Sequence, residues 1–120
     1  MNAAEFKQRT REFANRVINL AESLPSTRAA EVIVRQVIKS GTSVAANYRA
    51  ACRARSPADF QSKLGIVEEE ADETAFWLEL ISDRAYVKPT RLLPLLKEAN
   101  EILAMVVASI RTVRRKRKTA

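Results

Sequence analysis

The sequence predicts an all-α protein, an antiparallel up-down-up-down four-helix bundle. Apolar residues recur at helical spacing through most of the 120 residues, and no stretch alternates apolar and polar residues as a strand does. Prolines and a few turn signals divide the chain into four such stretches. Because the connections between them are short, consecutive helices are expected to be antiparallel neighbours. A chain of this length can bury the core of one domain.

The first expected helix runs from about Ala3 to Ser23. Its apolar residues share one face and are Phe6, Phe13, Val17, Leu20 and Leu24. Pro25 disfavours helical backbone at the residue before it, so the helix must end there. Ser26 or Thr27 can then cap the next helix.

The second expected helix runs from about Arg28 to Ala54, and its apolar arc is wide enough to pack against more than one neighbour. Gly41 lies near its middle and costs about 1 kcal/mol relative to alanine. This position indicates a close approach of two helices or a slight kink. Asn47 and Tyr48 lie on the apolar stripe, where a polar pair forms either a satisfied buried hydrogen-bond network or part of a subunit interface.

The third expected helix begins with a clear capping signal, in which Ser56 takes the cap, Pro57 the first helical position and Asp59 the first turn. Its apolar residues repeat every 3.5 residues, which is typical of the seam of a helical bundle. Phe76 and Trp77 form a second apolar edge and are expected to be core or interface anchors.

The fourth expected helix starts between Thr90 and Leu92, because Pro94 is tolerated only in a first turn. Its apolar residues repeat the same spacing as far as Val113. The predicted organisation is therefore a bundle over residues 1–113 and a basic C-terminal tail over residues 114–120.

Composition excludes most enzyme classes. The chain has no histidine, two glycines and one cysteine, Cys52. Histidine-dependent nucleophile systems and zinc sites, glycine-rich phosphate loops and intramolecular disulfides are therefore ruled out. We expect no enzyme, no cofactor and no metal. The N-terminus has no apolar signal core and no stretch is long enough to cross a membrane, so a cytoplasmic protein is expected.

The net charge of +7 is unevenly distributed. Residues 25–56 carry +5, residues 57–87 carry −6 and residues 111–120 carry +6. The acidic run from Glu68 to Glu73 is interpreted as a solvated or salt-bridged face, opposite Arg35, Lys39, Arg49 and Arg53, rather than as a metal site. If the third helix covers the second, the basic surface left for a partner is mostly the tail.

The tail is either a frayed, solubilising end or an arm that contacts a polyanion. It contains no aromatic residue, so sequence-specific reading of single strands by this segment is not expected. The candidate nucleic-acid-binding residues are Arg49, Arg53, Arg55, Arg111, Arg114, Arg115, Lys116, Arg117 and Lys118.

Two blocks of the sequence resemble a known family. Residues 40–48 read Ser-Gly-Thr-Ser-Val-Ala-Ala-Asn-Tyr, which is similar to that family's Ser-x-x-Ser-Ile-x-x-Asn-Tyr segment. Its second block resembles residues 59–60, residues 63–66 and residues 70–80, the last reading Glu-Ala-Asp-Glu-Thr-Ala-Phe-Trp-Leu-Glu-Leu. The family comprises the four-helix proteins encoded in intervening sequences of bacterial 23S ribosomal RNA genes, with the related accessory variability proteins of diversity-generating retroelements. Ala50 departs from the pattern, which often has glutamate there.

The resemblance implies a homopentamer without enzymatic activity and, for the retroelement branch, a basic scaffold that binds a reverse transcriptase and nucleic acid. Two function hypotheses follow. The first is an oligomeric scaffold that binds RNA or DNA electrostatically, and the second is a protein-interaction adaptor without a direct role in nucleic-acid binding. Gly41, Asn47, Tyr48, Phe76 and Trp77 are the expected structural or interface residues.

Overall fold

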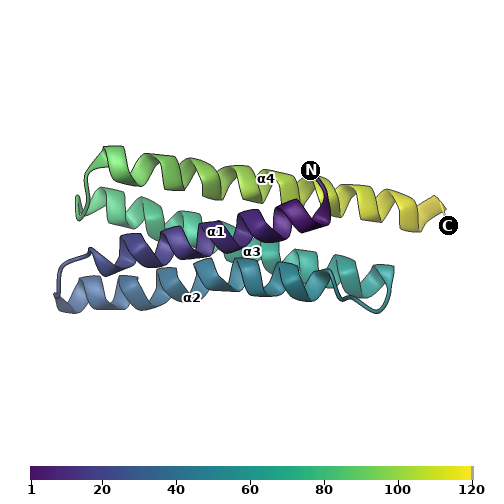
Figure 1. The fold of residues 1–120 in the computed structure, drawn as a ribbon, viewed down its shortest axis with the longest axis horizontal. Helices are drawn as coiled ribbons and strands as arrows, with labels where there is room; N and C mark the ends of the chain where they lie inside the picture. Colours follow the sequence, from purple (N-terminus) through teal and green to yellow (C-terminus); the bar gives the residue numbers. More distant parts are fainter. Residues whose placement is uncertain (120) are drawn as a thin grey trace.

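The computed structural model describes residues 1–119, which form four α-helices and no strand. The helices are α1 (Ala3–Glu22), α2 (Arg28–Ala51), α3 (Pro57–Asp83) and α4 (Pro89–Thr119). Successive helices run antiparallel along a rod of 52 × 22 × 21 Å (Figure 1). The predicted fold class is thereby confirmed. No helix among the described residues is both long and apolar enough to cross a membrane.

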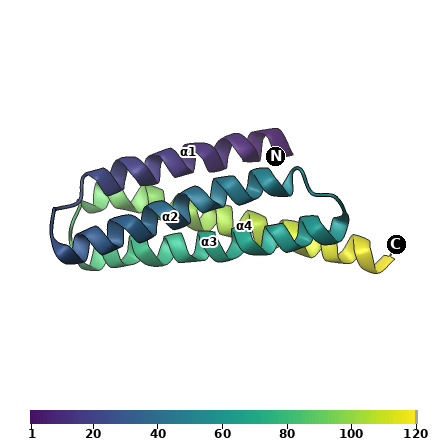
Figure 2. The ribbon, with the colours of Figure 1, turned by 90° about the horizontal axis from the view of Figure 1, so that it is seen from below.

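The four helices do not contact one another equally. α3 packs closely against both α2 and α4, and α1 packs against α2 but touches α4 sparsely (Figure 2). The core between them is formed by the apolar stripes expected from the sequence. Its largest fully buried apolar side chains are Phe13, Leu64, Leu78, Ile81, Leu92 and Ile102.

Capping residues define the beginnings of three helices. Asn2, Thr27 and Ser56 have extended backbones, and their side chains accept hydrogen bonds from the N–H groups three residues later. At α3 the Asp59 carboxylate also accepts from the N–H of Arg55, the residue before the cap, at 3.1 Å. The cap satisfies one of the backbone donors that a helix start otherwise leaves open, and the second bond fixes the chain that enters the helix.

The predicted end of the second helix is wrong by three residues, since α2 ends at Ala51 rather than Ala54. The N–H groups of Arg53 and Ala54 bond to carbonyls only three residues back, at 3.0 Å each, which marks a tight turn. The physical reason lies just beyond, because Ser56 must be extended to cap α3. The chain needs this short segment to reverse direction.

The predicted start of the fourth helix is also wrong, because α4 begins at Pro89 and Pro94 lies in its second turn. A proline there lacks the N–H that would bond one turn back. Burial of Leu92 and Leu95 on either side, at 0% and 3% exposure, holds this turn in helical form. At its other end, α4 continues without a break from residue 113 through Thr119. Residue 120 of the predicted tail lies outside the described residues.

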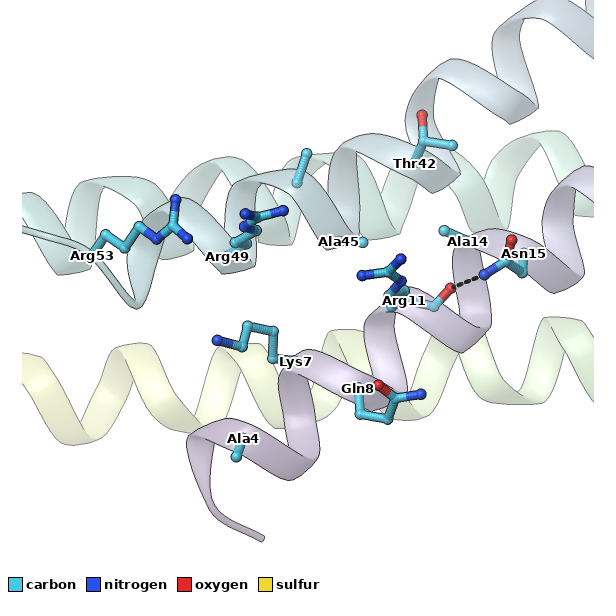
Figure 3. A pocket seen from close by; sticks show the side chains of 11 residues that line it. Ala4, Lys7, Gln8, Arg11, Ala14, Asn15, Thr42, Ala45, Arg49 and Arg53 are labelled. Carbon is cyan, nitrogen blue, oxygen red and sulfur yellow. Dashed lines mark hydrogen bonds between the residues drawn. The ribbon is translucent and has the colours of Figure 1, made fainter.

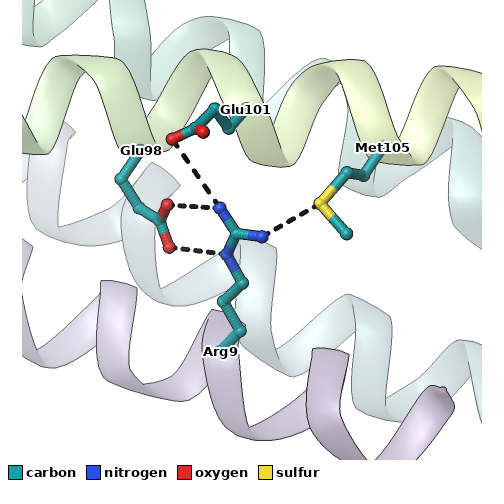
Figure 4. Close-up of polar contacts among 4 residues, drawn as sticks. All are labelled: Arg9, Glu98, Glu101 and Met105. Carbon is teal, nitrogen blue, oxygen red and sulfur yellow. Dashed lines mark hydrogen bonds and ion pairs between the residues drawn. The ribbon is translucent and has the colours of Figure 1, made fainter. Parts of the chain in front are cut away.

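One polar cluster bridges the sparse contact between α1 and α4. The Arg9 guanidinium donates two hydrogen bonds to the Glu98 carboxylate, at 2.8 and 2.6 Å, and lies 3.8 Å from Glu101 (Figure 4). Its remaining Nη1 lies 3.1 Å from the Met105 sulfur. Such a bidentate pair has a defined geometry, so it fixes the register of α1 on α4 where apolar contacts are few.

Candidate nucleic-acid interface

The basic residues gather at one end of the rod. This end holds the N-terminus, the α2–α3 turn and the last part of α4, and it comprises residues 1–12, 44–66 and 102–119 (Figure 1). These ranges contain thirteen basic and three acidic residues, whereas the rest of the chain contains eight basic and eleven acidic ones. The bundle therefore has one strongly cationic end, and the rest of the chain is mildly anionic. We call the first the basic end.

A groove of about 600 Å³ lies between α1 and α2 on the basic end. Lys7 and Arg11 of α1 stand on one wall, and Arg49 and Arg53 of α2 stand on the other (Figure 3). Each pair is spaced four residues apart, so both members point from the same face of their helix. The groove is completed by small or neutral residues, Ala4, Gln8, Ala14, Asn15, Thr42, Ala45 and Ala46. We refer to it as the α1–α2 groove.

The acidic residues of the basic end are all engaged elsewhere. Glu5 accepts one hydrogen bond from the Asn2 amide, Glu12 accepts one from the Gln8 amide, and Asp59 pairs with Lys63 at 2.7 Å. Within residues 1–119, none of the four groove cations lies within ion-pair distance of a carboxylate. The groove thus presents four exposed positive charges without internal compensation.

A second hollow, of about 690 Å³, lies beside this groove between α2 and α3. Arg49 and Arg53 border both hollows, and Arg55 and Lys63 add two more cations. The hydrogen bond from Lys63, followed by that from the Arg55 N–H, lowers the pKa of the Asp59 carboxyl. Asp59 therefore stays ionised near neutral pH and partly offsets the charges of Lys63 and Arg55. Because the two hollows share Arg49 and Arg53, they form one continuous track in which cations predominate.

The C-terminal part of α4 completes the basic end. Arg111 and residues 114–118 are exposed along the helix, which extends past the beginning of α1 (Figure 1). Arg117 donates from Nη1 to the Gln61 Oε1 at 2.6 Å, which fastens this segment to the start of α3. We call residues 111–119 the C-terminal arm. In the structure it is an ordered helical element that presents its charges at defined positions.

The basic residues predicted to bind nucleic acid fall into two groups, those that line the two hollows and those of the C-terminal arm. The structure also adds residues that sequence reasoning missed. Arg49 and Arg53 are exposed beside α1, so α3 does not cover the basic face of α2. Lys7 and Arg11 were missed because α1 is nearly neutral as a whole. The available signal was their four-residue spacing, which places both on one face of a helix.

The acidic run on α3 forms no close ion pair with α2 within residues 1–119. Desolvation, and then repulsion from Glu73, raise the pKa of Glu70, and Lys39 of α2 acts in the opposite direction. The run is therefore a largely solvated surface. Among the described residues, no group of three or more potential ligands is arranged to hold a metal ion.

The predicted interface residues occupy different environments. Gly41 is buried against α1, and the Asn47 amide donates to the Ser43 carbonyl one turn back at 2.9 Å. Phe76 is 50% exposed, and Trp77 packs beside the core with its ring 5.0 Å from that of Phe76. The buried Trp77 Nε1 has no hydrogen-bond partner within residues 1–119. Phe76 is thus not part of the core of a single chain.

Tyr48 is buried, and its ring meets the Phe6 ring edge-on, with ring centroids 4.7 Å apart. Desolvation, reinforced by Cys52, raises the pKa of the Tyr48 phenol to about 12. The phenol therefore stays neutral to a higher pH in the folded protein than in the unfolded chain, where its pKa is about 10.

We expect alkaline pH to destabilise the bundle through Tyr48. Its contribution is complete below about pH 10 and is lost as pH rises towards 12, because the unfolded chain ionises first. Denaturant unfolding across this range should show a steeper loss of stability for the wild type than for Tyr48→Phe. The phenylalanine variant keeps the ring and removes the titrating group. Equal losses in both proteins would contradict this account.

The fold and the basic end together define a class, that of small helical bundle proteins with a concentrated cationic surface. Residues 2–108 match the family described as 23S rRNA-intervening sequence protein, and the chain belongs to this family. The resemblance inferred from the two sequence blocks is thus confirmed. The C-terminal arm lies beyond the matched residues.

A solved structure is similar over nearly the whole chain. It is that of a protein with unknown function from the S23 ribosomal protein family of Bacteroides thetaiotaomicron. The two are 35% identical with a TM-score of 0.84, and the match covers 92% of this chain and 99% of that one. None of the curated proteins matches the chain.

Proposed function

We propose that the protein is a non-enzymatic, oligomeric scaffold that binds nucleic acid through electrostatic contacts. The observation that carries the proposal is the basic end, with its thirteen basic residues against three acidic ones. Cations that line two hollows and an ordered arm match the repeated charges of a phosphate backbone. The surface is also exposed, so the charges are available without rearrangement of the bundle.

The test is a salt titration of binding. Fluorescently labelled RNA and DNA should bind at about 50 mM salt, and six phosphate contacts would weaken binding on the order of 10³-fold by 200 mM. The logarithm of the binding constant should fall linearly with the logarithm of salt concentration. Failure to bind either nucleic acid at low salt would refute the proposal.

Oligomerisation is the second part of the proposal. Large apolar side chains remain exposed on the single chain, including Phe76 at 50% and Leu93 at 54%. Burying them between copies would remove this surface from water. Light scattering at micromolar protein should give a mass several times that of one chain, and a strictly monomeric mass would contradict this part.

A protein-interaction adaptor is the second candidate, favoured by a shallow apolar hollow on α4. Leu93, Leu96 and Ala104 contribute its apolar surface, and no other helix lines it within the described residues. An apolar, outward-facing patch of this kind suits a protein partner such as a reverse transcriptase. Co-elution with a reverse transcriptase encoded by a neighbouring gene would support this candidate, and separate elution would contradict it.

A further inference from the structure

We propose that the α1–α2 groove is a binding channel for the sugar-phosphate backbone of single-stranded nucleic acid, distinct in its preference from the C-terminal arm. The inference rests on the proposed nucleic-acid-binding function and assigns it a strand type and a place. It is argued from the width of the groove, the arrangement of its cations and the chemistry of its lining.

The width of the groove favours one strand. α1 and α2 are packed neighbours, and at Gly41 they approach so closely that an added Cβ would lie 2.8 Å from the Val17 Cγ1. This contact closes the groove at one end, because packed helices have axes about 8–10 Å apart. A nucleic-acid duplex is wider than this spacing, so we expect it to rest on the rim of the groove. A single backbone can lie along it.

The arrangement of the cations also favours one strand. Lys7 and Arg11 stand on the α1 wall and Arg49 and Arg53 on the α2 wall, so a backbone between them meets positive charge from both sides (Figure 3). Successive cations on each wall are four residues apart, which is a rise of about 6 Å along the helix axis. Arg49 and Arg53 continue into the α2–α3 hollow, where Arg55 and Lys63 extend the track.

The lining predicts binding without sequence preference. Alanines at positions 4, 14, 45 and 46 leave room for the backbone, and Gln8, Asn15 and Thr42 supply neutral polar groups. No aromatic side chain among the described residues lines the groove, so bases have no stacking platform there and are expected to face away from it. Backbone charge is then the main source of affinity.

The lack of internal ion pairs is consistent with a ligand role. Like charges four residues apart on a helix repel each other, and both walls contain such a pair. No carboxylate of residues 1–119 lies within ion-pair distance of these four cations, so no ion pair relieves this repulsion inside the described part of the chain. A polyanion in the groove would relieve it. The four cations therefore reduce stability in the free protein and gain a partner on binding, as is common at functional sites.

The test compares three charge variants of the full chain. The groove variant combines Lys7→Gln, Arg11→Gln, Arg49→Gln and Arg53→Gln. A matched control removes four exposed cations elsewhere, by Arg28→Gln, Arg35→Gln, Lys88→Gln and Lys97→Gln. The arm variant changes residues 114–118 to glutamine. The probes are oligodeoxythymidine and oligouridine of roughly 16 nucleotides, and a DNA duplex of similar length.

We expect the groove variant to lose affinity for both single strands on the order of 100-fold at about 50 mM salt, with its salt slope reduced by about 3. Its affinity for the duplex should change far less. The control variant should keep single-strand binding close to that of the wild type. Thermal unfolding of the groove variant should occur at or above the wild-type temperature, because like-charge repulsion has been removed.

Each negative result refutes a different part of the proposal. If the wild type binds no probe at low salt, the proposed function itself is refuted. If the wild type binds but the groove variant behaves like the control, nucleic-acid binding stands and the channel is refuted. Equal losses for duplex and single strands would also overturn it, because the groove would then not select one strand. A larger loss for oligouridine than for oligodeoxythymidine would support the channel and add a preference for RNA.

Discussion

Replacing residues 114–118 of the C-terminal arm by glutamine is expected to weaken binding to single strands and duplexes alike, on the order of 10²- to 10³-fold at about 50 mM salt. All five side chains are exposed, and the helix projects past α1, so a flat or curved polyanion can reach them. Glutamine keeps a good helix propensity, so the arm should remain helical. The salt slope should fall by roughly 4, about one for each phosphate that the variant no longer neutralises.

A charge-preserving variant is the control for the arm. Changing Arg114, Arg115 and Arg117 to lysine keeps every positive charge and removes only the planar guanidinium groups. Its salt slope should equal that of the wild type, although the hydrogen bond from Arg117 to Gln61 is altered. If the glutamine variant also keeps the wild-type slope, the arm does not contact phosphates.

The same substitution at two glycines is expected to change stability in opposite directions. Gly41→Ala adds a methyl group that meets Val17 Cγ1 at 2.8 Å and Val17 Cβ at 3.1 Å. Val17 is fully buried and β-branched, so its side chain cannot turn away without cost. Overpacking costs about 1–3 kcal/mol, which outweighs the gain of about 1 kcal/mol in helix propensity.

Gly65 provides the matched comparison. It lies inside α3, and a Cβ there would meet nothing within 4 Å among the described residues. Gly65→Ala should therefore stabilise the protein by up to about 1 kcal/mol. Urea unfolding of both variants at one protein concentration measures the difference. Equal stabilisation by both would show that α1 and α2 do not meet closely at Gly41.

A second substitution locates the steric conflict. In the Gly41→Ala background, Val17→Ala removes the two methyl groups that the new Cβ would strike. Because the residues are in contact, their effects should be non-additive, and the second change should cost less than it does in the wild type. Additive effects would place the cause of the Gly41→Ala loss elsewhere.

Much of the fold was predictable from local patterns. Ser56, Pro57 and Asp59 predicted the start of α3 because each contributes to a capping geometry that depends on a few neighbouring residues. The apolar stripes predicted the buried faces of all four helices. The errors fell at the end of α2 and the start of α4, where the turn after Ala51 and the helical Pro94 depart from the local pattern. There, chain reversal and burial of leucines outweigh local preference.

The candidate site was predictable only in part. Arg49, Arg53, Arg55 and the arm are visible as excess charge along the sequence. Lys7 and Arg11 belong to a helix whose acidic residues nearly cancel its basic ones, so composition hides them. Whether these two cations are free to bind a partner depends on which groups the Glu5 and Glu12 carboxylates contact, which is a matter of side-chain geometry.

The sequence by itself determined the four-helix bundle, the family and the lack of histidine-dependent chemistry, because periodicity, composition and short motifs are properties of the chain. Only the tertiary structure decided which positive charges remain available to bind a partner. Helix packing brings residues 7 and 11 opposite residues 49 and 53, about forty positions away in the chain, and leaves these four cations without a carboxylate within ion-pair distance. Charge counted along a sequence cannot show this, because electrostatic interaction depends on distance in space.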